Sequence, residues 1–523
     1  MMNRRRFLEL CVAAGFFAAF PEMTGCGPKN AMPRSAKGKA LAIINGRVVD
    51  VVKGRVLENA SLFIEKGRIV SVDFGPAPKP TDMLTVFDAE GAYLIPGLMD
   101  AHCHSTMSAA YGIKSVEAWR HYRQLRRQYE ASIASGVTTL RDVGAFPGLL
   151  HEFIREIESG ALNGPRIVFC NSILNVAGGH PDIPPTDVNV FAGITAYHMG
   201  MAMTNYSGKK ERDYALSNNS TDAHFVKLTV DRESLLCGKG EIPVYPDDDL
   251  KAIFGFAENR NMPVVCHCLT GWGLERMASW PIHSLEHIVS DTVLTDRQVL
   301  NIARRKTAVV PTISLGESYL IEEAYNVLPP EYNVEIVQKE LLFRREYLRE
   351  VPEYQCDPVI HAQNMARLSD YKRYAWSDMP GKKVYLARPD AFFGTAITGV
   401  RNLRKMRDAG VLIGVGMDAG LPFSYFGSLY REMEMLQRIG FSPAEVLACA
   451  TINNAKILGV EDRLGTLEDG KCADIVALNQ NPLDDMAATR QPSAVFKEGR
   501  LVHSNREWKR DADGMMRATG IAA

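Results

Sequence analysis

The stretch Gly-Leu-Met-Asp-Ala-His-Cys-His at positions 97–104 decides the fold of this chain. It is short and apolar, and it ends in two histidines that stand two positions apart, His102 and His104. Alternate residues of a strand point to the same side, so both imidazoles can reach one metal ion. The stretch therefore predicts a buried strand that carries a metal-binding pair at its carboxyl end.

Seven further segments share the length and apolar character of buried strands and alternate with helical patterns. The eight expected strands are 97–103, 136–143, 166–170, 224–230, 263–268, 283–288, 307–313 and 411–417. Strands that alternate with helices are typical of a parallel α/β sheet, and eight such units are typical of a (β/α)8 TIM barrel. In that fold the active site lies at the carboxyl ends of the strands.

Four other side chains of the metal-binding type fall at or near the ends of these strands. They are Lys227, His267, His287 and Asp418. Together with the histidine pair they predict a metal site at one end of the barrel, and therefore a hydrolase. Lysine is seldom buried without a partner, so Lys227 is expected either to reach solvent at the barrel mouth or to be chemically modified.

Two charged neighbours, Arg141 and Asp142, lie near the end of the second expected strand. We expect them to form an ion pair with each other at the barrel mouth. The expected role of that pair is structural and not catalytic.

The two ends of the chain predict a second module. Short alternating strands and turn glycines fill residues 39–95, and residues 465–505 have the same character. We expect these ends to form one composite β-sandwich module beside a barrel domain at 96–464. Residues 506–523 are expected to be a polar, poorly ordered tail.

The N-terminal segment has the features of an export signal. Residues 1–26 contain the run Asn-Arg-Arg-Arg-Phe-Leu, a short apolar stretch and Thr-Gly-Cys. The paired arginines predict twin-arginine export, and Thr-Gly-Cys resembles a lipobox in which Cys26 would carry the lipid. The chain is therefore expected to be periplasmic or a membrane-anchored lipoprotein, with residues 27–38 as a tether.

The composition disfavours several other classes of function. The formal net charge is −1, which gives no electrostatic argument for a nucleic-acid partner. After residue 30 no apolar stretch is long enough to span a bilayer, so membrane contact is expected only through the N-terminal anchor. Cys266 and Cys268 flank His267 and should point away from the barrel interior, as small buried hydrophobic side chains.

Several motifs together resemble the amidohydrolase superfamily. They are Ile-Pro-Gly-Leu-Met-Asp-Ala-His-Cys-His, Thr-Thr-Leu-Arg-Asp-Val-Gly, Gly-Gly-His at 178–180, Phe-Val-Lys, Leu-Glu-His, Met-Asp-Ala-Gly and Gly-Lys-Cys-Ala-Asp-Ile-Val. The resemblance covers nearly the whole chain after the export signal. Within the superfamily these motifs are most similar to those of the prolidase-like, imidazolonepropionase-related carboxypeptidases.

The resemblance implies a role for each residue of the expected site. Lys227 would be carboxylated on its amine and would bridge two divalent ions, which the resemblance implies to be zinc. The buried ion would be held by His102, His104 and Asp418. The outer ion would be held by His267 and His287. His180 would face a small-molecule substrate from the long loop after the third strand, and the chain is expected to form a homo-oligomer.

Such a site predicts hydrolysis of the amide bond of a dipeptide or an N-acyl amino acid. A hydroxide that bridges two ions is nucleophilic at neutral pH. Asp418 can accept its proton and then donate it to the leaving amine, as a general base and acid. An Xaa-Pro dipeptidase-like enzyme, or a related carboxypeptidase, fits these residues best.

Three alternatives remain open. The same centre could open a cyclic amide or a lactone, as an imidazolonepropionase-like enzyme would. A mononuclear deaminase is disfavoured, because Lys227 occupies the bridging position and no glutamate stands three residues after His267. A non-catalytic, membrane-anchored scaffold is also disfavoured, because all the expected ligand positions carry chemically sensible residues.

Overall fold

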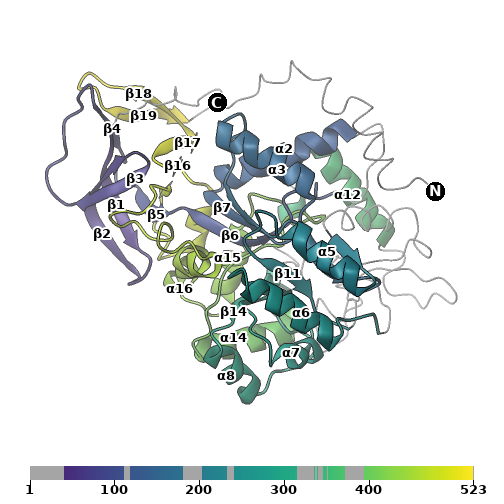
Figure 1. Cartoon of the computed structure of the whole chain (residues 1–523). Helices are drawn as coiled ribbons and strands as arrows, with labels where there is room; N and C mark the ends of the chain where they lie inside the picture. The colour runs from purple at the N-terminus through teal and green to yellow at the C-terminus, as the bar shows by residue number, and fades with distance from the viewer. Residues whose placement is uncertain are drawn as a thin grey trace.

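The computed structural model describes residues 40–110, 118–180, 203–232, 241–314, 335, 338–339, 346–349, 351–371 and 394–521. A barrel wrapped by helices occupies one side of the molecule, and a β-module occupies the other (Figure 1). The predictions for residues 1–26 and 27–38, including Cys26, lie outside the described residues. Within the described ranges, no helix has the length and apolar character needed to cross a membrane.

Seven regular strands form most of the barrel, in one parallel sheet of three strands and one of four. The strands are β6 (Leu98–Cys103), β7 (Val137–Asp142), β8 (Arg166–Phe169), β11 (Val226–Thr229), β12 (Val264–His267), β13 (Ser284–Glu286) and β14 (Ala308–Val310). The sheet orders are β6-β7-β8 and β11-β12-β13-β14, so neighbours in the chain are neighbours in space. Each strand lies inside a segment expected from the sequence, and the (β/α)8 prediction is confirmed.

The eighth expected strand, 411–417, is present only as an irregular segment between β14 and β6. Its backbone joins β14 through the bridge of Ile413 with Val309, and it joins β6 through a hydrogen bond from Ala101 N to Val415 O of 2.9 Å. The side chain of Asn454 bonds both backbone groups of Val415, at 3.0 and 2.8 Å. A side-chain amide thus replaces part of the strand ladder where the barrel closes.

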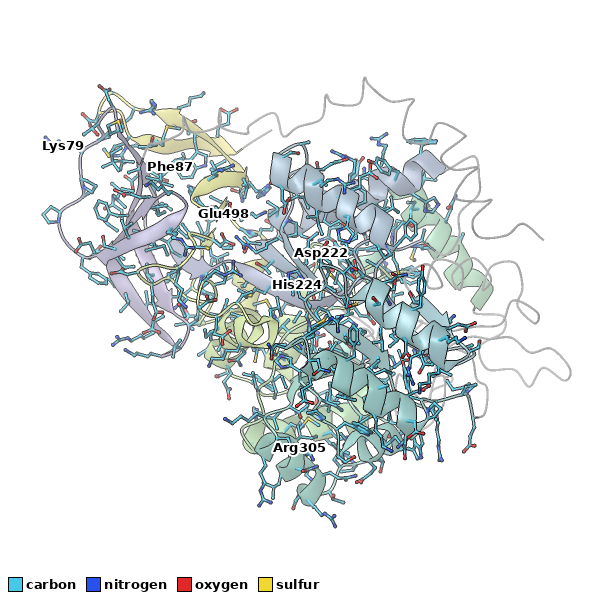
Figure 2. The ribbon with its side chains drawn as sticks, in the orientation of Figure 1. Lys79, Phe87, Asp222, His224, Arg305 and Glu498 are labelled. Carbon is cyan, nitrogen blue, oxygen red and sulfur yellow. The ribbon has the colours of Figure 1, made fainter. Side chains whose placement is uncertain are left out.

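The other junction of the two barrel sheets lies between β8 and β11. His224, which precedes β11, donates its backbone N–H to Phe169 O at 2.9 Å. Its ring Nδ1 accepts from Phe169 N at 3.3 Å. His224 is labelled near the centre of the molecule in Figure 2. These two bonds connect the two sheets, so the barrel is nearly closed.

Helices cover the outside of the barrel (Figure 1). Around it lie α2 (Ala118–Ala134), α3 (Pro147–Ser159), α5 (Lys209–Asn219), α6 (Asp247–Glu258), α7 (Gly271–Met277), α8 (Asp296–Arg304), α14 (Val400–Asp408), α15 (Tyr430–Arg438), α16 (Pro443–Ala448) and α17 (Asn454–Leu458). Shorter or separate elements are α12 (Pro358–Tyr371), η4 (Thr395–Gly399), η5 (Cys449–Asn453) and η6 (Met486–Arg490). After β8 the chain adds the parallel pair β9 (Ile173–Val176) and β10 (Met203–Tyr206).

The strands of the β-module come from both ends of the described chain and form one ten-stranded mixed sheet. They are β1 (Ala40–Asp50), β2 (Arg55–Glu65), β3 (Arg68–Asp73), β4 (Leu84–Asp88), β5 (Tyr93–Pro96), β15 (Ile475–Leu478), β16 (Ala494–Lys497), β17 (Arg500–Ser504), β18 (Arg506–Arg510) and β19 (Met516–Ile521). The order is β17-β16-β15-β5-β1-β4-β19-β18, with β2 beside β1 and β3 beside β2. The expected composite module is therefore confirmed.

The module has a hydrophobic cluster of its own. Leu62 of β2, Phe87 of β4 and Phe496 of β16 belong to this cluster, although these three strands do not pair with one another. The sheet therefore folds over on itself, as a sandwich does. Phe87 meets Phe496 and Trp508 edge-on, with ring centroids 5.4 and 5.1 Å apart, and it is labelled in Figure 2.

The prediction of a polar tail at 506–523 is wrong. Most of this segment forms the antiparallel hairpin of β18 and β19, which joins the sheet where Met516 pairs with Phe87. Its many polar residues conceal two apolar side chains, Trp508 and Met516, that pack on or within the module cluster. These two contacts fix the hairpin in place.

Candidate metal centre

The metal-type side chains expected from the sequence lie together at the carboxyl ends of the barrel strands. The buried members are His102, His104, Lys227, His287 and Asp418. The side chain of His267 is 12% exposed, about as much as that of His104 at 11%. The structure thus brings all six expected residues into one place.

The imidazole rings form a continuous row. The ring centroids are 5.8 Å apart for His104 and His102, 4.6 Å for His102 and His287, and 4.4 Å for His287 and His267. His180 continues the row, because its ring stacks on His267 at 4.4 Å and 29°. Rings contributed by three strands and one loop therefore converge.

Hydrogen bonds at Nδ1 fix the rings of the first two histidines. His102 Nδ1 lies 2.8 Å from a carboxylate oxygen of Glu286, and His104 Nδ1 lies 2.7 Å from Gly144 O. Arg141 and His102 outweigh the effect of burial and lower the pKa of Glu286 below its usual range, so this carboxylate only accepts. A carbonyl oxygen also only accepts. Each Nδ1 therefore donates, and each Nε2 is left with a lone pair in the neutral ring.

The two Nε2 atoms face Asp418. Its Oδ1 lies 3.1 Å from Nε2 of His104 and 3.4 Å from Nε2 of His102. This oxygen is buried, and while both rings are neutral it accepts no hydrogen bond from any described residue. Burial would raise the pKa of Asp418, but positive charge and hydrogen bonds from His102 and His104, when these rings carry a proton at Nε2, hold it well below its usual range, so Asp418 is a carboxylate.

A converging group of lone pairs needs a cation. One ligand atom from each of His102, His287 and Asp418 lies within 4.8 Å of the others. Two imidazole nitrogens and a carboxylate oxygen are ligands that divalent transition metals prefer. The donor set and the orphaned Asp418 oxygen therefore fit a metal ion.

The outer two histidines have polar partners of their own. His287 Nδ1 lies 2.7 Å from Thr312 Oγ1. His267 Nε2 lies 3.6 Å from Asp231 Oδ2. Asp231 is held in turn by the backbone N–H and the hydroxyl of Thr270, at 3.1 and 2.6 Å. Burial keeps the pKa values of both histidines well below the usual range, so both rings are neutral ligands.

Lys227 does not reach solvent at the barrel mouth. It is only 2% exposed, so the expectation that it reaches solvent is wrong. Burial lowers the pKa of its amine, although the carboxylates of Glu286 and Asp418 raise it. A lowered pKa increases the share of neutral amine, which is the form that can be carboxylated.

His180 lies beside the group and not among its ligands. Its backbone carbonyl accepts from Thr229 Oγ1 at 2.6 Å, which ties the loop after β9 to the end of β11. Burial lowers the pKa of the His180 imidazole to about 4, so the ring is neutral. Contact with a substrate stays a prediction for this residue.

The predicted ion pair between Arg141 and Asp142 is wrong. Adjacent strand residues point to opposite sides, so these two side chains diverge. Arg141 pairs with Glu286 inside the barrel at 2.6 Å. Asp142 instead accepts from the backbone N–H groups of Ser105 and Gly144, at 2.7 and 2.9 Å, and holds the turn after His104.

Three partners of the histidines were missed by sequence reasoning: Glu286, Thr312 and Asp231. Glu286 did carry a signal. It stands two residues after Ser284 in an otherwise apolar strand, so it had to point into the barrel. Thr312 and Asp231 follow strands in loops, where no periodicity marks them.

The prediction for the cysteines is confirmed. Cys266 and Cys268 are buried in the main hydrophobic cluster, which includes Leu228 and Leu285 of the neighbouring strands. Both are free thiols. They face away from His267 and take no part in the metal-type group.

Comparison with known proteins agrees with this fold. The sequence profile of the amidohydrolase family matches residues 93–502. An uncharacterized protein of Mycobacterium tuberculosis is 24% identical over 426 residues, which cover 80% of this chain and 86% of that protein. An imidazolonepropionase of Geobacillus kaustophilus is 35% identical over 123 residues, 23% of this chain and 28% of that protein.

Solved structures share the architecture over almost their whole length. A Xaa-Pro dipeptidase with bound methionine has a TM-score of 0.66 and 22% identity, covering 88% of this chain and 99% of that chain. A prolidase complexed with N-methylphosphonate-L-proline has a TM-score of 0.65 and 21% identity, covering 89% of this chain and 100% of that chain. Fold and site define a TIM-barrel hydrolase. The chain belongs to the amidohydrolase family.

Proposed function

We propose that the chain is a metal-dependent hydrolase of amide bonds, with a dipeptide or an N-acyl amino acid as substrate. The single observation that carries the proposal is the buried Asp418 oxygen, which lies 3.4 and 3.1 Å from Nε2 of His102 and His104, at a point where a cation could replace the ring protons. A carboxylate in that position serves both to hold a cation and to exchange protons with a reacting group. The enzyme would be a dipeptidase or carboxypeptidase of the Xaa-Pro dipeptidase-like kind.

The residues suit two divalent cations, and zinc suits these nitrogen and oxygen ligands. His102, His104 and Asp418 would hold one ion. His267 and His287 would hold the other, with Lys227 as a carbamate between them. His102, His287 and Asp418 each offer a ligand atom within 4.8 Å of the others, so the two proposed ion positions would lie next to each other.

When bound, the ions would lower the pKa of a water molecule and polarise the scissile carbonyl. The remaining steps belong to the chain. Asp418 is a carboxylate at neutral pH, so it can accept a proton from the attacking water and then donate it to the leaving amine. The neutral rings of His267 and His180 stack at one end of the histidine row, where we propose that a substrate binds.

Two kinds of support favour a peptide substrate. The solved structures that share this fold include a Xaa-Pro dipeptidase and a prolidase bound to a phosphonate analogue that contains L-proline. His180, whose ring stacks on His267, would contact a substrate beside the group. We also propose a homo-oligomer, exported by a twin-arginine signal and anchored through Cys26.

Hydrolysis of a cyclic amide or a lactone is a second candidate. It is favoured by the similarity to an imidazolonepropionase, which covers 23% of this chain. The same groups would attack any activated carbonyl, and only the substrate would differ.

The experiment that tests the proposal is amine release from a library of dipeptides and N-acyl amino acids by the zinc-loaded chain. Replacement Asp418→Asn keeps the size of the side chain but removes the base, and turnover should fall by about 10²–10⁴-fold. Circular dichroism controls for the fold of the variant. Equal turnover by the variant would contradict the role of Asp418. Turnover confined to cyclic imides or lactones would favour the second candidate.

A further inference from the structure

Behind the metal-type residues the barrel contains an ion pair that is fully buried. Arg141 of β7 and Glu286 of β13 are 1% and 0% exposed, and Arg141 Nη2 lies 2.6 Å from Glu286 Oε1. The two strands belong to different barrel sheets, so the pair crosses the interior. Removing two charges from water commonly costs more than their attraction returns. Stability is therefore a poor explanation for this pair, and another role has to be found.

The second oxygen of the carboxylate shows that role. Glu286 Oε2 accepts from Nδ1 of His102 at 2.8 Å, while Oε1 accepts from Arg141 and from Ser284 Oγ at 2.6 Å. Each oxygen thus faces a different partner, and the carboxylate is held in one orientation. The ring of His102 is consequently held in one orientation too.

We propose that Glu286 is a positioning residue that fixes His102 as the Nδ1-protonated tautomer, with Nε2 open to a divalent cation, and that Arg141 holds Glu286 in that position. The inference rests on the metal centre of the proposed function. Partners of this kind orient metal-binding histidines and raise their basicity, and losing one typically costs 10–100-fold in metal affinity or activity.

Arg141 holds both ends of this contact. Its Nε donates to Ala101 O at 2.6 Å, directly before His102 in the chain, and its Nη1 donates to Ser284 Oγ at 3.1 Å. One planar guanidinium therefore fixes the backbone that carries His102 and the carboxylate that orients its ring. Lysine has no such fork of donors and could not hold both.

The test is the zinc affinity of the full chain and of Glu286→Gln, measured by competition with a chelator of known affinity. If the amide oxygen of the variant side chain still accepts from His102, the amide N–H groups face the N–H donors of Arg141, and two sets of donors oppose each other. An amide that is flipped donates to Nδ1 and moves the ring proton to Nε2. In both cases zinc affinity should fall by about 10–100-fold. Unchanged affinity overturns the proposal.

Two further variants separate positioning from folding. Glu286→Gln alone leaves the Arg141 charge buried and unpaired, which is itself destabilising. The double variant Glu286→Gln with Arg141→Gln removes both charges, and it should recover thermal stability without recovering zinc affinity. Recovery of both would show that the pair is only structural. Ser284→Ala, which removes a contact to the same carboxylate but none to His102, should lose less zinc affinity than Glu286→Gln.

The outcomes also distinguish this inference from the proposed function. A wild-type chain that binds zinc but cleaves no amide would contradict the reaction and leave the zinc comparison valid. An active wild-type chain whose Glu286→Gln variant binds zinc as tightly would contradict only the positioning role. A wild-type chain that binds no zinc would overturn both.

Discussion

The β-module and the barrel interior are both buried, but they are filled by different kinds of side chain. The module cluster consists of aliphatic and aromatic residues, among them Phe87 and Phe496. The upper barrel interior instead holds Arg141, Glu286 and Lys227, and the apolar side chains of the same strands point outwards to the helices. Apolar burial stabilises in any charge state, whereas buried charges persist only while each is compensated. The module thus supplies stability, and the barrel interior supplies chemistry.

The largest loss of stability is expected from the substitution Phe496→Ala in the module. Removing a buried phenyl ring costs about 3–5 kcal/mol of unfolding free energy, measured by denaturant titration. The zinc content should not change, because the ring lies in the module cluster. Val70→Ala, which alters an exposed residue of the same module, should cost less than about 0.5 kcal/mol. Loss of zinc in Phe496→Ala would contradict the division between the two regions.

A smaller effect is expected from removing metal with a chelator. An ion that binds only the folded chain stabilises it by about 2.7 kcal/mol at a free concentration 100 times its Kd. The melting temperature should therefore rise with zinc concentration. Because the two regions are distant, Phe496→Ala should show the same zinc-dependent increment as the wild type. A melting temperature that is indifferent to zinc would contradict a metal centre in the barrel.

The smallest effect is a dependence of the unfolding free energy on pH. It is caused by a lysine where the module meets the barrel. Lys497 of β16 donates to Gly164 O at 2.7 Å, and burial lowers the pKa of its amine from 10.5 to about 8. Between these values the unfolded chain binds more protons than the folded chain, so this residue makes stability rise with pH. Denaturant unfolding at pH 8 and at pH 10 should show the rise in wild type, and Lys497→Met should lack it. An equal rise in the variant would assign the slope to another group.

The sequence was sufficient for the features that depend on local pattern. Strand positions followed from apolar runs, and the expected metal-type residues followed from His or Asp at the ends of these runs and from Lys227 within one. What could not be predicted depends on pairing across the barrel. Arg141 was assigned to its neighbour Asp142, because sequence alone does not show that Glu286 approaches from another strand. The irregular eighth strand likewise depends on Asn454, which lies far along the chain.

The pairing of β5 with β15 has a consequence for the topology of the whole molecule. Tyr93 stands opposite Leu478 and Pro96 opposite Ile475, where the chain enters and leaves the barrel. This antiparallel pair joins the beginning and the end of the chain segment that forms the barrel. A cut in a surface loop of the barrel would therefore leave two fragments that are still fastened together. A pull at Tyr93 and Leu478 would unzip the pair one residue pair at a time, because these two residues lie at the same end of the antiparallel pair.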